Sequence, residues 1–230
     1  LDSNSSTTFL LEETKLSKYF RLVKSDTLYN ELYKTLKSSS SQLIQYDSLK
    51  INNTINAIYT YRDTSTANYI KKIAWTQGGT LYALNAIGSK DAVEDIDLHR
   101  ILKSIRYTVK PQEFDIYGSK AALLFEDVNS PDTLIAKEAK NTISTHYKFT
   151  KDELPLVYKK LLKRHADDDM DDGIRVTLIK SLEDNHDKQS VTFLKNMLLE
   201  SSLTDQIKTA ILSTVWEIDS TQIDWYLKEL

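Results

Sequence analysis

The chain has 230 residues with a formal net charge of −3, and 40% of its residues are hydrophobic and 27% charged. This length and composition are ordinary for a soluble protein of one large or two small domains. The absence of cysteine excludes disulfides, thiolate metal sites and a cysteine nucleophile. Residues 1–115 carry 15 Lys and Arg against 13 Asp and Glu, and residues 116–230 carry 15 against 20. Neither half has the concentrated basic face that phosphate binding needs, so we expect no nucleic-acid partner.

The N-terminal residues 1–8 are rich in Ser, Thr and Asn, which predicts disorder. The chain begins at Leu1 rather than Met, so we expect a processed product or a section of a longer protein, compatible with export after removal of an N-terminal signal. No apolar run approaches the roughly 20 residues of a membrane-spanning helix, so we predict no transmembrane segment. The sequence specifies neither the compartment nor the oligomeric state.

Residues 12–37 predict a helix that is interrupted near Ser25 and Asp26. Asp26 is a suitable N-cap, and apolar residues follow it at helical spacing. Residues 42–51 have a mixed pattern that indicates neither helix nor strand clearly.

Three segments rich in β-branched and aromatic residues then predict antiparallel strands. They are residues 55–62, 67–75 and 80–87. Gly78 and Gly79 supply the positive φ angles that a tight turn between the last two needs. The alternation is apolar on both faces in places, so we expect a meander covered on both sides.

A helix capped by Asp95 should follow, with apolar residues at helical spacing. These are Leu98, Ile101, Leu102 and Ile105. Residues 107–109 return as a last strand in this prediction. Residues 1–110 are therefore expected to form an α+β domain, an antiparallel sheet with flanking helices.

The ending Ile101-Leu-Lys-Ser-Ile-Arg-Tyr107 and the order of the predicted elements resemble the PsbP/Mog1-like α+β fold. The resemblance covers residues 25–109. It implies a fold and not an activity, since that family has diverse and mostly non-catalytic roles.

Residues 111–119 contain Pro111 and Gly118 and are expected to be a junction. After them nearly every segment predicts a helix, with capping residues at most of the starts. The predicted helices are 120–127, 132–145, 151–164, 173–183, 188–199, 204–216 and 221–230. Residues 120–230 should therefore form an all-α domain.

The helical domain contains a repeated pattern. Residues 172–182 align with residues 205–215 at an offset of 33, so that four apolar positions match: Ile174, Leu178, Ile179 and Leu182 with Ile207, Ile211, Leu212 and Val215. A two-helix repeat of this length cannot bury its apolar face alone and must stack on neighbours. An earlier and weaker copy matches at offsets of 39 and 36. The matched sets are Ile135, Ala139 and Ile143 with Ile174, Leu178 and Leu182, and Val157, Tyr158 and Leu161 with Phe193, Leu194 and Met197.

Two-helix units of this length without tetratricopeptide or ankyrin signatures resemble HEAT repeats over residues 130–230. The resemblance implies a helical solenoid that offers an extended surface for binding.

The acidic run 167–172 is the most conspicuous polar segment. Asp167, Asp169 and Asp171 have the spacing of a calcium loop, but the sixth position is Asp172 instead of Gly and the twelfth is Leu178 instead of Glu. We therefore predict an inter-helix loop whose last residue, Asp172, caps the next helix.

No catalytic pattern is present. There is no Gly-x-Ser-x-Gly and no phosphate-binding loop among the five glycines. The four histidines, which are His99, His146, His165 and His186, are expected at surface or cap positions. We predict no catalytic residue, no metal site and no cofactor.

Aromatic residues gather in the predicted sheet. They are Tyr59, Tyr61, Tyr69, Trp75 and Tyr82. One interpretation is a binding face for a carbohydrate or peptide. The other is core packing and cross-strand pairing.

The leading functional hypothesis is a non-catalytic protein-interaction or scaffolding module with a protein partner. The first alternative is a ligand-binding protein or enzyme with a pocket between the two domains, around residues 107–130. The second is a structural spacer of an exported protein.

Overall fold

The computed structural model describes residues 7–22, 41–51, 54–97, 100, 101, 104, 113–200 and 202–222. The chain divides into two compact units, Leu1–Gly118 and Ser119–Leu230. This division falls in the segment 111–119 that the sequence marks as a junction. The described part of the first unit is built on an antiparallel sheet and that of the second on helices, which confirms the predicted α+β class.

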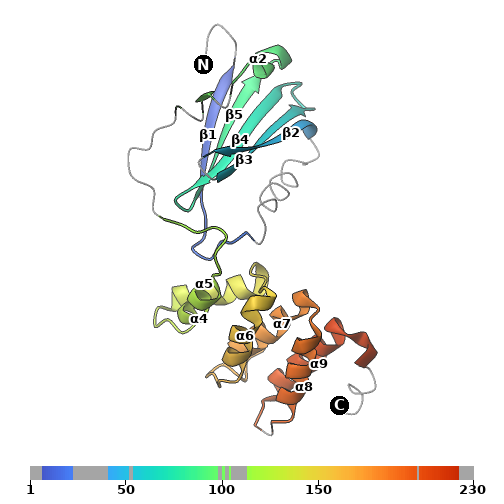
Figure 1. Cartoon of the computed structure of the whole chain (residues 1–230). Helices are drawn as coiled ribbons and strands as arrows, with labels where there is room; N and C mark the ends of the chain where they lie inside the picture. Colours follow the sequence, from blue (N-terminus) through green and yellow to red (C-terminus); the bar gives the residue numbers. More distant parts are fainter. Residues whose placement is uncertain are drawn as a thin grey trace. The chain divides into compact units, whose positions relative to one another are not determined.

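The sheet has five strands in the order β1-β5-β4-β3-β2, with every neighbouring pair antiparallel (Figure 1). The strands are β1 (Thr8–Lys15), β2 (Ser41–Ile51), β3 (Thr54–Asp63), β4 (Tyr69–Gln77) and β5 (Thr80–Gly88). The three predicted strands coincide with β3, β4 and β5, and the mixed segment 42–51 is β2. Gly78 and Gly79 form the β4–β5 turn with φ angles of 56° and 74°, as predicted.

Strand β1 overturns two predictions. Residues 12–15 are strand and residues 16–22 contain no helix, where a helix over 12–37 was expected; Thr8 is paired with Ile87, where disorder was expected. All eight side chains of β1 are exposed. Because neither face of this strand is buried, its sequence has no need to alternate apolar and polar residues, and it does not. Its backbone is fixed by pairing with the distant strand β5, which no local pattern reveals. The other residues of the two predicted segments, 1–6 and 23–37, lie outside the described residues.

The helix predicted to start at Asp95 is confirmed in its described residues, 100, 101 and 104, but its cap is Asp97, whose Oδ1 accepts a hydrogen bond from Arg100 N. A short helix that was not predicted, α2 (Lys90–Glu94), precedes it, and the Ser89 side chain caps this helix by accepting a hydrogen bond from Ala92 N. Asp95 lies at the C-cap of α2 and therefore does not start the next helix. The predicted strand 107–109 lies outside the described residues.

The sheet buries side chains on both faces. On one face Ile58, Ile73 and Trp75 pack against Ile96 and Ile101. On the opposite face the buried residues are Ala57, Tyr59 and Tyr61. Two buried faces explain why consecutive residues of β3 and β4 are apolar, as at 57–59 and 73–75.

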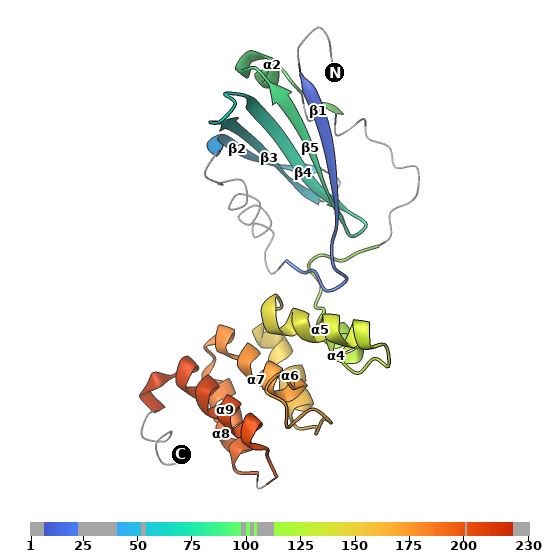
Figure 2. The ribbon, with the colours of Figure 1, turned by 180° about the vertical axis from the view of Figure 1, so that it is seen from behind.

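The second unit is formed by helices and three short 3₁₀ turns among its described residues (Figure 2). The helices are α4 (Ala121–Asp127), α5 (Thr133–Thr145), α6 (Leu154–Leu161), α7 (Ile174–Ser181), α8 (Lys188–Leu198) and α9 (Asp205–Ile218). The 3₁₀ turns are Lys151–Glu153, Glu183–Asn185 and Ser220–Gln222. Each of the first six predicted helices is confirmed, while most of 221–230 lies outside the described residues.

Helices α5, α7 and α9 lie side by side in that order, and α6 lies beside α8. The rings of Tyr158 in α6 and Phe193 in α8 stack at 4.3 Å between centroids. Six consecutive residues of α7, 174–179, are buried, so this helix is surrounded by its neighbours. The unit is therefore organised around α7.

Candidate functional site

The aromatic residues of the sheet do not form one surface. The strand register places Tyr59 and Tyr61 on one face and Tyr69, Trp75 and Tyr82 on the other. Tyr59, Tyr61 and Trp75 are buried, and Trp75 stacks on its cross-strand partner Tyr82 with 5.4 Å between ring centroids. Only Tyr69 and Tyr82 are partly accessible.

Burial raises the pKa of the Tyr59 and Tyr61 hydroxyls, with the neighbouring Tyr46 and Glu12 adding to the respective shifts. Both hydroxyls therefore stay protonated and uncharged at neutral pH. Neither has the lowered pKa of an activated general base.

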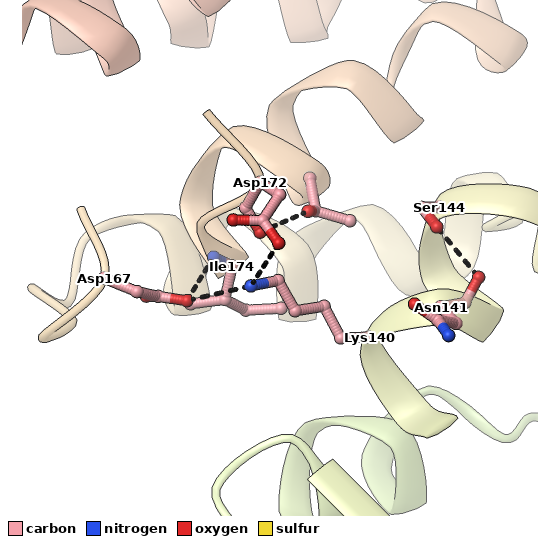
Figure 3. A network of polar contacts seen from close by, with 7 residues as sticks. Lys140, Asn141, Ser144, Asp167, Asp172 and Ile174 are labelled. Atoms are coloured by element: carbon pink, nitrogen blue, oxygen red, sulfur yellow. Dashed lines mark hydrogen bonds and ion pairs between the residues drawn. The ribbon is translucent and has the colours of Figure 1, made fainter. Parts of the chain in front are cut away.

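The acidic run 167–172 is a structural loop between α6 and α7 (Figure 3). Asp167 Oδ2 accepts a hydrogen bond from Ile174 N at 3.0 Å. The same oxygen forms an ion pair with Lys140 Nζ of α5 at 3.2 Å. The prediction that Asp172 caps α7 is wrong, because Gly173 occupies the N-cap position and the Asp167 carboxylate receives the helix N–H. Asp172 instead lies 3.7 Å from Lys140 Nζ.

Gly173 explains the shape of this loop. A Cβ atom at that position would overlap the carbonyl oxygens of Asp167 and Met170, so only glycine lets the loop close on itself. The loop thus brings the carboxylates of Asp167 and Asp172 to Lys140, and that of Asp167 to the start of α7. No group of three or more His, Asp or Glu side chains suited to a metal occurs in the described part of the chain.

Two side chains behind the loop are more deeply buried. Arg175 NH1 of α7 donates to Asp168 Oδ2 at 2.9 Å. His165 lies nearby, and burial together with the charge of Lys160 lowers its pKa against the attraction of Asp168. In the folded protein, this histidine is therefore neutral over a wider pH range than an ordinary one.

Glu153 is a buried carboxylate at the start of α6. Its two oxygens accept hydrogen bonds from the hydroxyls of Ser119, Tyr147 and Thr150 and from Thr150 N. Burial and the bond to Glu153 raise the pKa of Tyr147 to about 12. The network contains a capping box and ties three segments together, so its chemistry is that of a structural cluster.

A groove of about 360 Å³ runs between α5 and α7. Its walls are the end of α5 with residues 143–148 and one side of α7, including Thr177, Lys180 and Ser181. Most of the lining side chains are polar and exposed. Two of them, Lys148 and Asp184, form an ion pair of 3.2 Å.

The serine and threonine hydroxyls in this groove are not paired with a base. Ser144, Thr177 and Ser181 each donate to a backbone carbonyl, at 2.9, 3.4 and 2.7 Å. A nucleophilic serine or threonine would donate to a histidine or carboxylate base instead.

The end of α6 carries a cluster of basic residues that is not apparent when charges are counted over each half of the chain. Lys159, Lys160, Lys163 and Arg164 lie within six residues, and the described structure gives none of them a side-chain hydrogen bond or ion pair. The charge of Lys163 adds to burial in lowering the pKa of Lys160. A scan of local charge runs in the sequence would have found this cluster.

Among the described helices, none has the length and apolar character needed to cross a membrane. Comparison with protein families and with curated proteins finds no match to the chain.

Proposed function

We propose that the protein is a non-catalytic protein-interaction or scaffolding module, and that it binds a segment of a partner protein in the groove between α5 and α7. We further propose that its helical unit is a stack of HEAT-like two-helix units. In this arrangement α5, α7 and α9 are the first helices of successive units, and α6 and α8 are second helices.

The buried positions support the repeat. Ile174, Leu178 and Leu182 of the middle unit are buried, as are the residues that match them at an offset of 33. Those residues are Ile207, Ile211 and Val215. In the earlier copy Ala139 and Ile143 are also buried. Equivalent residues thus serve the same packing role in each unit, as stacking requires.

Polar bonds between neighbouring first helices and their loops support a rigid stack. At one end Lys140 pairs with Asp167, and Thr204 Oγ1 donates to Asp168 O at 2.6 Å. At the other end Thr214 Oγ1 donates to Glu183 at 2.8 Å. A surface held at both ends changes little on binding, which lowers the entropic cost of association.

The groove itself is the observation that carries the proposal. It is partly open to solvent and lined mainly by polar side chains, whereas small-molecule sites are lined mostly by apolar ones. Lys180 and the hydroxyls of Ser144 and Ser181 offer hydrogen bonds to an extended segment that enters from solvent. The side chains that line the groove thus favour a polypeptide ligand over a substrate that undergoes reaction.

Site-specific photo-crosslinking of the full chain tests the proposal. A benzophenone amino acid replaces Ser144 or Ser181 in the groove, and Thr192, an exposed residue of α8, serves as the matched control position. We expect one discrete protein to be crosslinked at both groove positions and not at Thr192, with loss of the product in Lys180→Glu. Equal products at all three positions, or products unaffected by Lys180→Glu, would contradict a partner site in this groove.

A further inference from the structure

We propose that the C-terminal ends of α6 and α8 form a second binding surface, which docks an acidic segment of a partner protein that also carries apolar residues. This surface shares no residue with the groove between α5 and α7, and the inference does not depend on that groove being occupied.

The first observation is the cluster of unpaired cations on α6. Three other cations of this unit have anionic partners: Lys140 with Asp167, Lys148 with Asp184 and Arg175 with Asp168. Within the described residues no side-chain hydrogen bond or ion pair is formed by the four cations of the cluster. The cluster is Lys159, Lys160, Lys163 and Arg164.

The helix dipole accounts for only part of this cluster. A helix C-terminus has the equivalent of roughly half a negative charge, which favours nearby cations. Four positive charges within six residues exceed that requirement and repel one another. An external anion would reduce this repulsion.

The second observation is a set of exposed leucines at the same helix ends. Leu162, which follows α6, is 60% exposed, and Leu199, which follows α8, is 79% exposed. Helices α6 and α8 are direct neighbours, since Tyr158 OH and Ser190 Oγ lie 2.8 Å apart. Leu162 and Leu199 occupy corresponding positions, one residue beyond each helix.

Charge complementarity identifies the partner. Cations beside exposed leucines match a segment that carries both carboxylates and apolar side chains. The cluster spans six residues at the end of α6, which suits a short segment.

Fluorescence anisotropy with the full chain tests this surface. The probe is a short fluorescein-labelled peptide that alternates glutamate and leucine, and a peptide that alternates lysine and leucine is the control. The test variant combines Lys159→Gln, Lys163→Gln and Arg164→Gln. The matched control variant removes the same charge from exposed lysines elsewhere in the unit: Lys137→Gln, Lys151→Gln and Lys188→Gln.

We expect the acidic peptide to bind the wild type and the control variant alike, and the test variant about tenfold more weakly. Binding should also weaken as salt is raised, and Leu162→Ser with Leu199→Ser should weaken it at constant charge. Equal binding by both triple variants, or equal binding of the lysine peptide, would overturn the inference. Binding of phosphatidylserine-containing vesicles that the test variant loses, without binding of the acidic peptide, would replace it with a membrane contact.

Thermal unfolding followed by circular dichroism checks that both triple variants are folded. The photo-crosslinking at Ser144 and Ser181 reports on the groove alone. A failure of either surface is therefore distinguished from a failure of the other.

Discussion

The two units hold their elements together in different ways. In the sheet unit, strand β1 is joined to β5 by eight backbone-paired positions while all of its side chains are exposed. In the helical unit, α7 buries six consecutive residues, and side-chain bonds connect it to α5 and its neighbours at both ends. The stability of the helical unit therefore depends on particular side chains, whereas the attachment of the edge strand β1 depends on its backbone hydrogen bonds.

This contrast also bears on function. The sheet places Tyr59, Tyr61 and Trp75 in its core, where they contribute packing. The helical unit presents a polar groove and a cationic helix end on a framework fixed by its own polar bonds. Both surfaces that we propose for binding therefore lie on the helical unit.

The largest effect is expected from Arg175→Met. The Arg175 and Asp168 side chains are 3% and 13% exposed, so the variant leaves a buried carboxylate without its cation. Loss of one partner of a buried pair costs about 3–5 kcal/mol of unfolding free energy. Adding Asp168→Asn should recover most of the loss in urea denaturation of the full chain. A loss below about 1 kcal/mol, as for a surface pair, would contradict the dependence on this bond.

A matched pair of leucine substitutions compares the contribution of a side chain to stability in the two units. Leu178 of α7 is fully buried, and Leu11 of β1 is 53% exposed. We expect Leu178→Ala to lower the unfolding free energy by about 2–5 kcal/mol. Leu11→Ala should change it by less than about 0.5 kcal/mol. Comparable losses in denaturant unfolding would show that β1 also depends on its side chains.

A smaller effect is expected from Glu153→Gln. The substitution keeps the shape but places an NH₂ group against donors from Ser119, Tyr147 or Thr150. At least one buried donor then has no acceptor, which costs about 1–3 kcal/mol. Glu138→Gln, an exposed residue of α5, is the control, and its midpoint of thermal unfolding should stay that of the wild type.

The smallest effect is the pH dependence contributed by His165. Because burial and Lys160 lower its pKa, the unfolded chain takes up a proton below about pH 6.5 that the folded protein does not. Stability is therefore retained above that pH and falls as pH decreases below it. His165→Gln should reduce this fall in urea midpoints, and His146→Gln, at the exposed C-cap of α5, should not. A steeper fall in His165→Gln would contradict the sign.

The helices were largely predictable because each is specified by its own sequence. Asp132, Asp187 and Thr204 cap α5, α8 and α9 with their side chains, and the buried residues follow at helical spacing. Strand β1 was not predictable, since its partner β5 lies far along the chain and its exposed side chains do not alternate.

The candidate surfaces were only partly predictable. The run from Lys159 to Arg164 is visible in the sequence, but whether other groups neutralise it depends on the fold. The groove joins residues 143–148 with α7, and only the packing of α5 on α7 brings them together. The role of Asp167 as the acceptor at the start of α7 likewise requires a loop that turns back on itself, which Gly173 makes possible.

The most direct test of the account is hydrogen exchange of the full chain with and without the partner captured by photo-crosslinking. Binding in the groove predicts increased protection of amides in residues 143–148 and 177–184, with little change in β3 and β4. Protection confined to the strands, or unchanged exchange at both walls of the groove, would contradict the assignment of binding to the helical unit.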